Sequence, residues 1–220
     1  MIIIEKDIIW SGSIFTLTNR RALYWKEENT LVLSDLHVGK AAHFRKNGIP
    51  ISSLIHQQDL WRLELLIIHF NPSRIIFVGD LIHATDNSEV KELKTFIQKH
   101  GNIEFILVRG NHDRMTESKL NDIGIDEVCT NFYLRGVQFI HEPAPSAGYP
   151  QISGHIHPGV SVRLPANRWH RFPAFVVGVD DLILPAFSHF TGLDTKKNTT
   201  GAVFYAFHDE EIFEVSGNVR

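Results

Sequence analysis

Three short apolar runs, each ending directly in a cluster of polar residues, constrain the fold of this chain more than any other feature. The runs cover residues 31–34, 75–78 and 103–108. Short aliphatic and β-branched runs bounded by Gly, Asn and Asp are typical of strands buried on both faces. We therefore predict a sheet in which each of these strands ends in polar side chains.

Helical patterns fill the two gaps between these strands. Apolar residues recur every three or four positions across 51–68 and again across 88–101, as expected for helices with one buried face. This alternation of strand and helix favours parallel strands joined by right-handed crossovers. The first half of the chain is therefore predicted to have an α/β fold.

Short strands separated by turns are predicted in the rest of the chain. They cover residues 137–140, 151–153, 160–164, 174–177, 182–184, 202–207 and 211–215, and residues 2–25 show the same pattern. Such a series favours an antiparallel or mixed sheet packed as a second layer on the first. Because no repeat or linker divides the chain, we expect a single domain over residues 1–220.

Composition and charge exclude several classes of protein. The 220 residues are 43% hydrophobic and 21% charged, which is a globular composition. No apolar stretch is long enough to cross a bilayer, so we expect a cytoplasmic protein without a membrane partner. The formal net charge of −3 argues against a surface that is basic throughout. Any contact with a polyanion should therefore be local.

Side chains of the types that bind metals follow one predicted strand after another. They are Asp35, His37, Asp80, Asn111, His141, His155 and His157. Side chains two positions apart in an extended segment share a face, which pairs Asp35 with His37 and His155 with His157. Seven mixed oxygen and nitrogen ligands exceed one tetrahedral zinc site. They suit two adjacent metal ions that share a bridging carboxylate.

Each of these clusters has a plainer interpretation when it is taken alone. Asp-x-His and Gly-Asp are common in surface turns, and a histidine in an apolar strand is usually a hydrogen-bonded core residue. Five clusters in this order, each at the end of an apolar run, nevertheless favour a metal site over coincidence.

The order of the clusters resembles the calcineurin-like metallophosphoesterase superfamily over almost the whole chain. The segments that carry the resemblance are Asp35-x-His37, Gly79-Asp80, Gly110-Asn111-His112-Asp113, His141 and Gly154-His155-x-His157. The resemblance implies a four-layer α/β/β/α sandwich. One departure is His83, because the superfamily usually has Gly-Asp-x-x-Asp at the second motif.

The same resemblance implies a role for each site residue. One metal would be held by Asp35, His37, Asp80 and His157, and the other by Asp80, Asn111, His141 and His155. Asp80 would bridge the two ions. His112 would be the catalytic imidazole, oriented by Asp113.

A narrower resemblance is found in residues 35–50, 152–158, 184–187 and 190–192. These segments are similar to the bacterial ligase-associated DNA-damage-response endonucleases, the PdeM-like phosphoesterases. This family implies a manganese-dependent nuclease or phosphodiesterase with a functional link to a DNA ligase and a helicase. Iron, zinc and magnesium remain possible metals.

The segment after the first motif, expected to be a loop, contains Lys40 and Arg45. Arg45 could hold a substrate phosphate with two hydrogen bonds and Lys40 could act as a point charge, although a solvated basic loop fits equally well. The leading hypothesis is a DNA endonuclease or phosphodiesterase linked to DNA repair. The alternative is a phosphodiesterase or pyrophosphatase for nucleotides or other small molecules. A binding scaffold without metals is least favoured, because every ligand position is filled.

Overall fold

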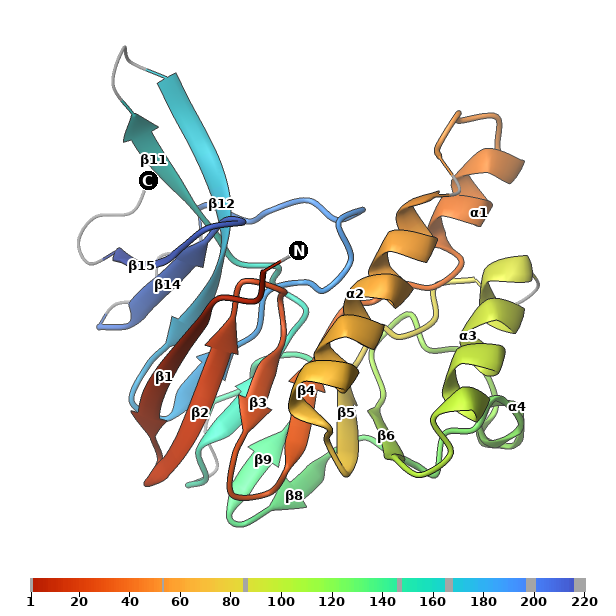
Figure 1. The fold of residues 1–220 in the computed structure, drawn as a ribbon, viewed down its shortest axis with the longest axis horizontal. Helices are drawn as coiled ribbons and strands as arrows, with labels where there is room; N and C mark the ends of the chain where they lie inside the picture. Colours follow the sequence, from red (N-terminus) through yellow and green to blue (C-terminus); the bar gives the residue numbers. More distant parts are fainter. Residues whose placement is uncertain are drawn as a thin grey trace.

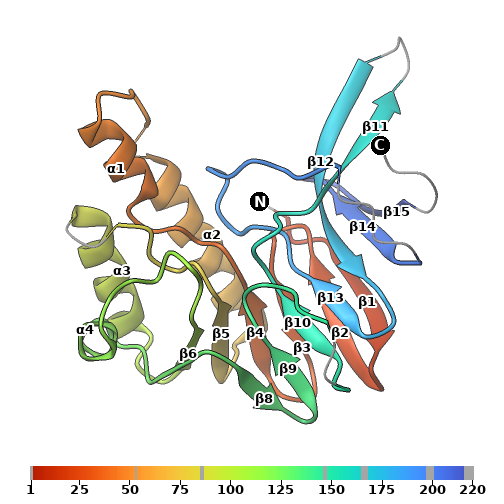
Figure 2. The ribbon, with the colours of Figure 1, turned by 180° about the vertical axis from the view of Figure 1, so that it is seen from behind.

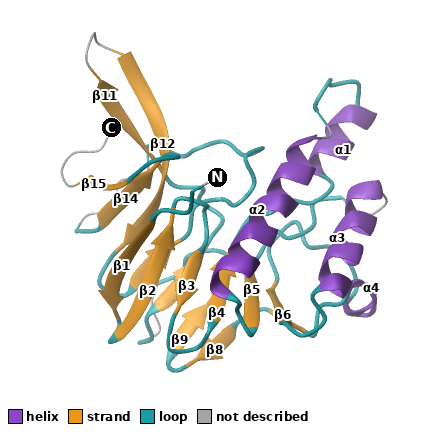
Figure 3. Ribbon diagram, viewed as in Figure 1, coloured by secondary structure: helices purple, strands orange, loops and turns teal. Residues whose placement is uncertain are grey.

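Two β-sheets pack face to face, and the described helices all lie on the outer side of the first sheet (Figures 1 and 3). The computed structural model describes residues 2–52, 54–84, 87–145, 148–164, 168–196 and 201–215. None of the helices in these ranges is long and apolar enough to span a membrane.

The first sheet contains the strands that were predicted in the first half of the chain. In spatial order its strands are β1 (Glu5–Trp10), β2 (Ser13–Thr18), β3 (Leu23–Trp25), β4 (Thr30–Leu33), β5 (Arg74–Val78), β6 (Glu104–Val108) and β7 (Glu127–Cys129). The pairs from β4 to β7 are parallel and those from β1 to β4 are antiparallel. The prediction of parallel strands at the first three apolar runs is confirmed.

The described helices are α1 (Lys40–Lys46), α2 (Leu54–Phe70), α3 (Ser88–Lys99) and α4 (Glu117–Ile123). The two predicted helices correspond to α2 and α3. Side chains alternate across β4, so that Leu31 and Leu33 pack with Leu63 of α2, while Val32 packs toward the second sheet. The central strands β4, β5 and β6 are buried on both faces, which explains their nearly continuous apolar sequences.

The second sheet is mixed, as predicted. In spatial order its strands are β15 (Ile212–Val215), β14 (Val203–Phe207), β12 (Arg168–Val177), β13 (Asp181–Ile183), β10 (Gln151–Ser153), β9 (Val137–Phe139) and β8 (Phe132–Leu134), and β11 (Gly159–Leu164) pairs with β12. β10 is parallel to β9 and β13, and the other pairs are antiparallel. Figure 2 shows β10 and β13 from behind.

The two faces of the second sheet are covered differently. Phe139 and Phe175 pack on its inner face against the first sheet. On the outer face Val176 and Phe204 pack with Val160 of β11. The mixed α/β fold of two sheets is therefore confirmed. In the described residues the outer face is covered by a strand, and the helices form one layer on the first sheet.

The segment at 40–46 forms helix α1, and the expectation of a loop there was wrong. A helix of this length is marginal by itself, so its stability comes from tertiary contacts. It follows Gly39, which has a φ of 88° and whose Cβ, if present, would lie 2.5 Å from the carbonyl oxygen of Ala84. The Gly39 N–H donates to Oε2 of the buried Glu89, at 2.9 Å. These contacts link α1 to the start of α3.

Candidate metal centre

The predicted metal ligands come together at the carboxyl ends of the central strands. Asp35 follows β4, Asp80 follows β5 and Asn111 follows β6 in the first sheet, while His141 follows β9 and His155 follows β10 in the second. Parallel strands place their carboxyl ends at one edge, where α/β proteins bind ligands. Both sheets therefore contribute to one site.

Two groups of ligand atoms are present at this edge. Asp35, His37 and His157 form the first, and Asp80, His141 and His155 form the second, with the ligand atoms of each group within 4.8 Å of one another. In the first group, His157 Nε2 lies 3.1 Å from Asp35 Oδ1. In the second group, His155 Nδ1 lies 3.2 Å from His141 Nε2. Each group has the size of a single-ion site.

Asp80 connects the two groups, and Asn111 belongs with the second. One Asp80 oxygen, Oδ1, lies 3.5 Å from His141 Nε2, and the other, Oδ2, lies 4.0 Å from His37 Nδ1. The side-chain oxygen of Asn111 is 3.1 Å from His141 Nε2. The structure thus brings all seven predicted ligands together, with one carboxylate between the two groups.

Unsatisfied polar atoms support metal binding by these residues. Both ring nitrogens of His37 are buried without a hydrogen-bond partner in the described part of the chain. Buried polar atoms are nearly always paired, and an unpaired one is costly. A cation coordinated by a His37 nitrogen would remove this cost, so the residues fit a metal centre.

The backbone at the ligands is also unusual. Positive φ angles occur at Asp35 (56°), His37 (50°), Asp80 (50°), His155 (67°) and His157 (53°). Residues other than glycine rarely adopt this conformation, and they keep it only where the surrounding structure imposes it. Here the positive φ angles occur in the segments that come after strands, where the candidate ligand side chains approach one another.

Electrostatics keep two of the candidate ligands, His37 and Asp80, in forms that bind cations. Burial lowers the pKa of His37 to about 3, so its imidazole is neutral. Burial alone would raise the pKa of Asp80, but hydrogen bonds from His141 and from the His112 backbone lower it to about 2. Metal binding requires neutral imidazole and ionised carboxylate. His37 and Asp80 already have these forms at neutral pH.

The match to a known family agrees with this geometry. Residues 29–170 match the model of the calcineurin-like phosphoesterases. The chain belongs to this family. It is therefore a metal-dependent phosphoester hydrolase, as the sequence predicted.

Two solved structures are similar to this chain to different degrees. Pseudomonas putida nuclease MPE, known from its crystal structure, is 27% identical in sequence to this phosphoesterase. The match has a TM-score of 0.80 and covers 92% of this chain and 96% of that one. The E. coli phosphoesterase Yfce is 14% identical, with a TM-score of 0.43 over 84% of this chain and 97% of that one. A comparison with curated proteins found no match.

Two glycines of the phosphoesterase motifs leave room for the ligands. A Cβ on Gly79 would lie 2.1 Å from His141 Nδ1, and one on Gly110 would lie 2.2 Å from Asp80 Oδ1. Any larger residue would displace a ligand. Both motifs therefore need glycine for packing, and Gly79, with a φ of 79°, also needs it for the turn.

His112 lies beside the ligand groups. Its Nε2 is 3.9 Å from Asp80 Oδ2, and its side chain is 37% exposed. Its backbone N–H donates to Asp80 Oδ1 at 2.9 Å. His112 is thus held next to the centre with a ring that solvent and substrate can reach.

Asp113 holds the backbone of the site. Its Oδ1 accepts the N–H of Ile82 at 2.8 Å and its Oδ2 accepts the N–H of Gly110 at 2.9 Å. The resemblance implied that Asp113 orients the His112 ring. In the structure the contacts of the Asp113 carboxylate are with the loops that follow β5 and β6, so any effect on His112 acts through the backbone.

Replacing Asp113 by alanine is expected to destabilise the fold as well as reduce activity. The change leaves the buried N–H of Ile82 unpaired, at about 1–3 kcal/mol, and the partly buried N–H of Gly110 unpaired at a smaller cost. For a chain of this size the melting temperature should fall by roughly 2–4 °C per kcal/mol. Thermal unfolding of the metal-free protein measures this effect. An unchanged melting temperature with lost turnover would instead indicate a direct catalytic role.

The two candidate phosphate contacts lie in different surroundings. Arg45 Nη2 lies 2.8 Å from Oε1 of the buried Glu89, so its charge is already paired. Burial lowers the pKa of Lys40, while the carboxylates of Asp35 and Asp80 oppose that shift. Lys40 Nζ also lies 5.8 Å from the centre of the Phe190 ring. Of the two, Lys40 is the cation whose pKa responds to the charges of Asp35 and Asp80.

His83 and Glu89 were not among the predicted site residues. The His83 ring centre is 4.5 Å from that of His112, and burial, followed by the charge of His112, lowers the pKa of His83 to about 4. His83 is therefore a neutral neighbour of His112. Its place in the second motif was a usable signal, whereas nothing in the sequence distinguishes Glu89 from other helical glutamates.

Proposed function

We propose that this phosphoesterase cleaves phosphodiester bonds of DNA. The observation that carries the proposal is the pair of ligand groups joined by Asp80. Two metal ions held side by side are found in nucleases, as they are in phosphatases and polymerases. The 27% identity and TM-score of 0.80 with Pseudomonas putida nuclease MPE support the choice of a nucleic acid.

Each ligand group would hold one divalent ion, for which we propose Mn²⁺. Bound ions of this kind lower the pKa of a coordinated water and neutralise phosphate charge. We propose that His112 donates a proton to the leaving oxygen or stabilises the charge that develops on it. The exposed ring and the hydrogen bond from the His112 backbone to Asp80 support this role.

The cellular role follows from the narrower resemblance. We propose a cytoplasmic enzyme of DNA repair with a functional link to a DNA ligase and a helicase. The segments 35–50, 152–158, 184–187 and 190–192 carry this part of the proposal.

A direct comparison of substrates tests the function. The manganese-loaded protein should cleave single-stranded or duplex DNA faster than cyclic dinucleotides, nucleoside diphosphates and an aryl phosphodiester at equal concentration. The same preparation after chelation with EDTA is the control and should be inactive. Preference for a cyclic dinucleotide or a diphosphate over DNA would favour the alternative, a small-molecule phosphodiesterase or pyrophosphatase.

Lys40→Gln should reduce cleavage of an oligonucleotide more than cleavage of a small aryl phosphodiester. An oligonucleotide has phosphates next to the scissile one that Lys40 can neutralise, and the aryl substrate has none. The salt dependence of oligonucleotide binding should also flatten, by roughly one unit of slope per lost phosphate contact. Lys91→Gln, an exposed change on α3, is the matched control.

Equal losses on both substrates would show that Lys40 supports the metal centre or the fold. Arg45→Gln is a useful second variant, because Arg45 is paired with Glu89. Arg45→Gln should change substrate preference less than Lys40→Gln does.

A further inference from the structure

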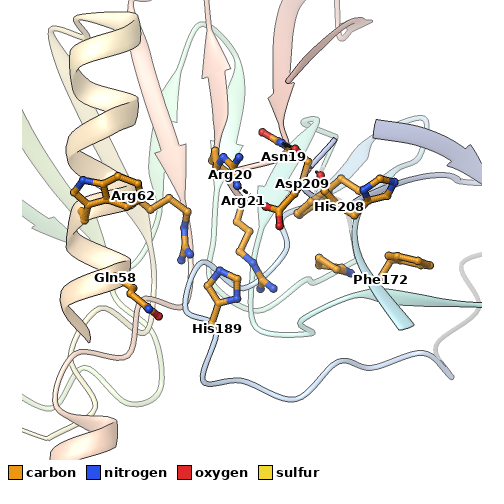
Figure 4. A pocket seen from close by; sticks show the side chains of 12 residues that line it. Asn19, Arg20, Arg21, Gln58, Arg62, Phe172, His189, His208 and Asp209 are labelled. Atoms are coloured by element: carbon orange, nitrogen blue, oxygen red, sulfur yellow. Dashed lines mark hydrogen bonds and ion pairs between the residues drawn. The ribbon is translucent and has the colours of Figure 1, made fainter. Parts of the chain in front are cut away.

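A cavity of about 510 Å³ lies apart from the candidate metal ligands. The turn between β2 and β3, helix α2 and the segment after β14 surround it, and Figure 4 shows the side chains that line it. Arg20, Arg21 and Arg62 line this cavity together with His189. None of the seven proposed metal ligands contributes to its lining.

The charges around this arginine cavity do not balance. Arg20 Nη1 lies 2.8 Å from Asp209 Oδ1, and Arg62 Nη2 lies 2.7 Å from Asp59 Oδ1. Arg21 has no carboxylate within ion-pair distance in the described residues, and its Nη1 donates to the carbonyl oxygen of Ala186 at 2.8 Å. Two carboxylates thus face three guanidinium groups, which leaves one positive charge without a partner.

Two of the lining arginines also have an unused donor group. The Nε atoms of Arg20 and Arg62 are buried without hydrogen-bond partners in the described part of the chain. Arg21 is held in the left-handed region, with a φ of 66°, which is uncommon for a residue with a side chain. Figure 4 shows its guanidinium group directed toward His189. The chain thus keeps an unpaired cation at this place despite a conformational cost.

The pKa values in the cavity reflect this surplus of positive charge. Burial, followed by the charge of Arg62, lowers the pKa of Arg21 to about 10. Burial, followed by the charges of Arg62 and Arg21, lowers the pKa of His189 to about 3. An anion would offset the repulsion between the cations and supply acceptors for their N–H groups.

We propose that the arginine cavity binds a phosphate group, with Arg21 as its principal contact. A phosphate has more acceptor oxygens than a carboxylate, and guanidinium groups bind it with paired hydrogen bonds. The cavity is larger than a phosphate ion, and the aromatic rings of Trp61 and Phe172 line it. A phosphate carried by a nucleotide or a nucleic-acid strand therefore fits as well as a free one.

The arginine cavity is connected to the metal centre through the backbone of residues 186–188. The carbonyls of Ala186 and Phe187 accept hydrogen bonds from Arg21 and Arg62. The Phe187 and Ser188 N–H groups donate to the carbonyls of Ser34 and Asp35, at 2.8 and 3.1 Å. A phosphate on the arginines would thus lie beside the segment that supports the metal ligand Asp35.

Titration calorimetry with inorganic phosphate tests the proposal. We expect Gln58→Glu, an exposed change in the lining of the cavity, to weaken phosphate binding at least about 10-fold. Arg21→Gln should have a similar effect. The matched control is Gln57→Glu, since Gln57 is exposed on the same helix and does not line the cavity. It should change the affinity by less than about twofold.

The titrations are made with the manganese-loaded enzyme and again in EDTA. The comparison distinguishes phosphate binding to the metal ions from phosphate binding to the arginine cavity. Equal phosphate affinity of Gln58→Glu and Gln57→Glu in both conditions would overturn the proposal. The proposal would also be overturned if the folded wild-type protein bound no phosphate in EDTA. Because no cleavage is measured, this result does not depend on the proposed DNA substrate.

A second arm identifies the source of the phosphate. If the cavity holds a phosphate of the substrate strand, Gln58→Glu should raise the KM for an oligonucleotide and leave cleavage of the aryl phosphodiester unchanged. If it holds a free phosphate or nucleotide, the KM for the oligonucleotide should stay the same while adenosine monophosphate binds more weakly to Gln58→Glu.

Discussion

Replacing Asp80 by asparagine is expected to abolish most of the activity and to lower the metal content of the protein. The two Asp80 oxygens face different ligand groups, one 3.5 Å from His141 Nε2 and the other 4.0 Å from His37 Nδ1. An amide offers one neutral oxygen in place of two that share a negative charge. Mutation of a residue that only supports a metal ligand typically lowers metal affinity or activity about 10–100-fold. Loss of a ligand shared by two ions should therefore lower activity at least about 100-fold.

The measurement combines elemental analysis at saturating manganese with the rate of phosphodiester cleavage. Wild-type protein should hold two ions per chain and the variant fewer. Asp122→Asn makes the same chemical change at an exposed position on α4 and is the matched control. One ion or none in a fully active wild-type protein would contradict the dinuclear centre.

Replacing His112 by alanine should reduce turnover by ~10²-fold or more while the metal content stays near normal. His112 is in neither ligand group, and its interaction with Asp80 Oδ1 comes from the backbone N–H, which alanine retains. The variant therefore removes the imidazole and keeps the contact that positions the loop. The effect should fall on kcat more than on KM.

Metal analysis separates a catalytic role of His112 from a ligand role. His170→Ala, at an exposed position of β12, is the matched control and should retain full turnover. A loss of metal in parallel with the loss of turnover would make His112 a ligand. Retained turnover would assign proton transfer to another group, for which His83 is the nearest candidate at 4.5 Å between ring centres.

The family and the seven candidate metal ligands could be inferred from sequence because they depend on local patterns. A strand buried on both faces needs a continuous apolar run, and its last residue marks where the chain reaches the edge of the sheet. Asp35, Asp80 and Asn111 each follow such a run, and these three runs form the parallel strands β4, β5 and β6. Their order along the chain was enough to indicate one shared edge.

The pairing of charges was decided by the tertiary structure. Arg45 was a candidate phosphate contact beside the first motif. In the structure it forms an ion pair with Glu89, which lies 44 positions later. The helix α1 that carries Arg45 was expected to be a loop, since seven residues have little helical stability of their own. Its contacts with the start of α3 exist only in the folded chain.

The arginine cavity shows the same limit of sequence reasoning. Arg21 and Arg62 are 41 positions apart and follow no recognisable pattern, yet the fold places both against residues 186–187. Sequence by itself predicted most of the strands and the candidate ligands at their ends, because each depends on neighbouring residues. Only the packing of the two sheets and of α2 decided which distant charges meet, because that depends on which surfaces the core brings together.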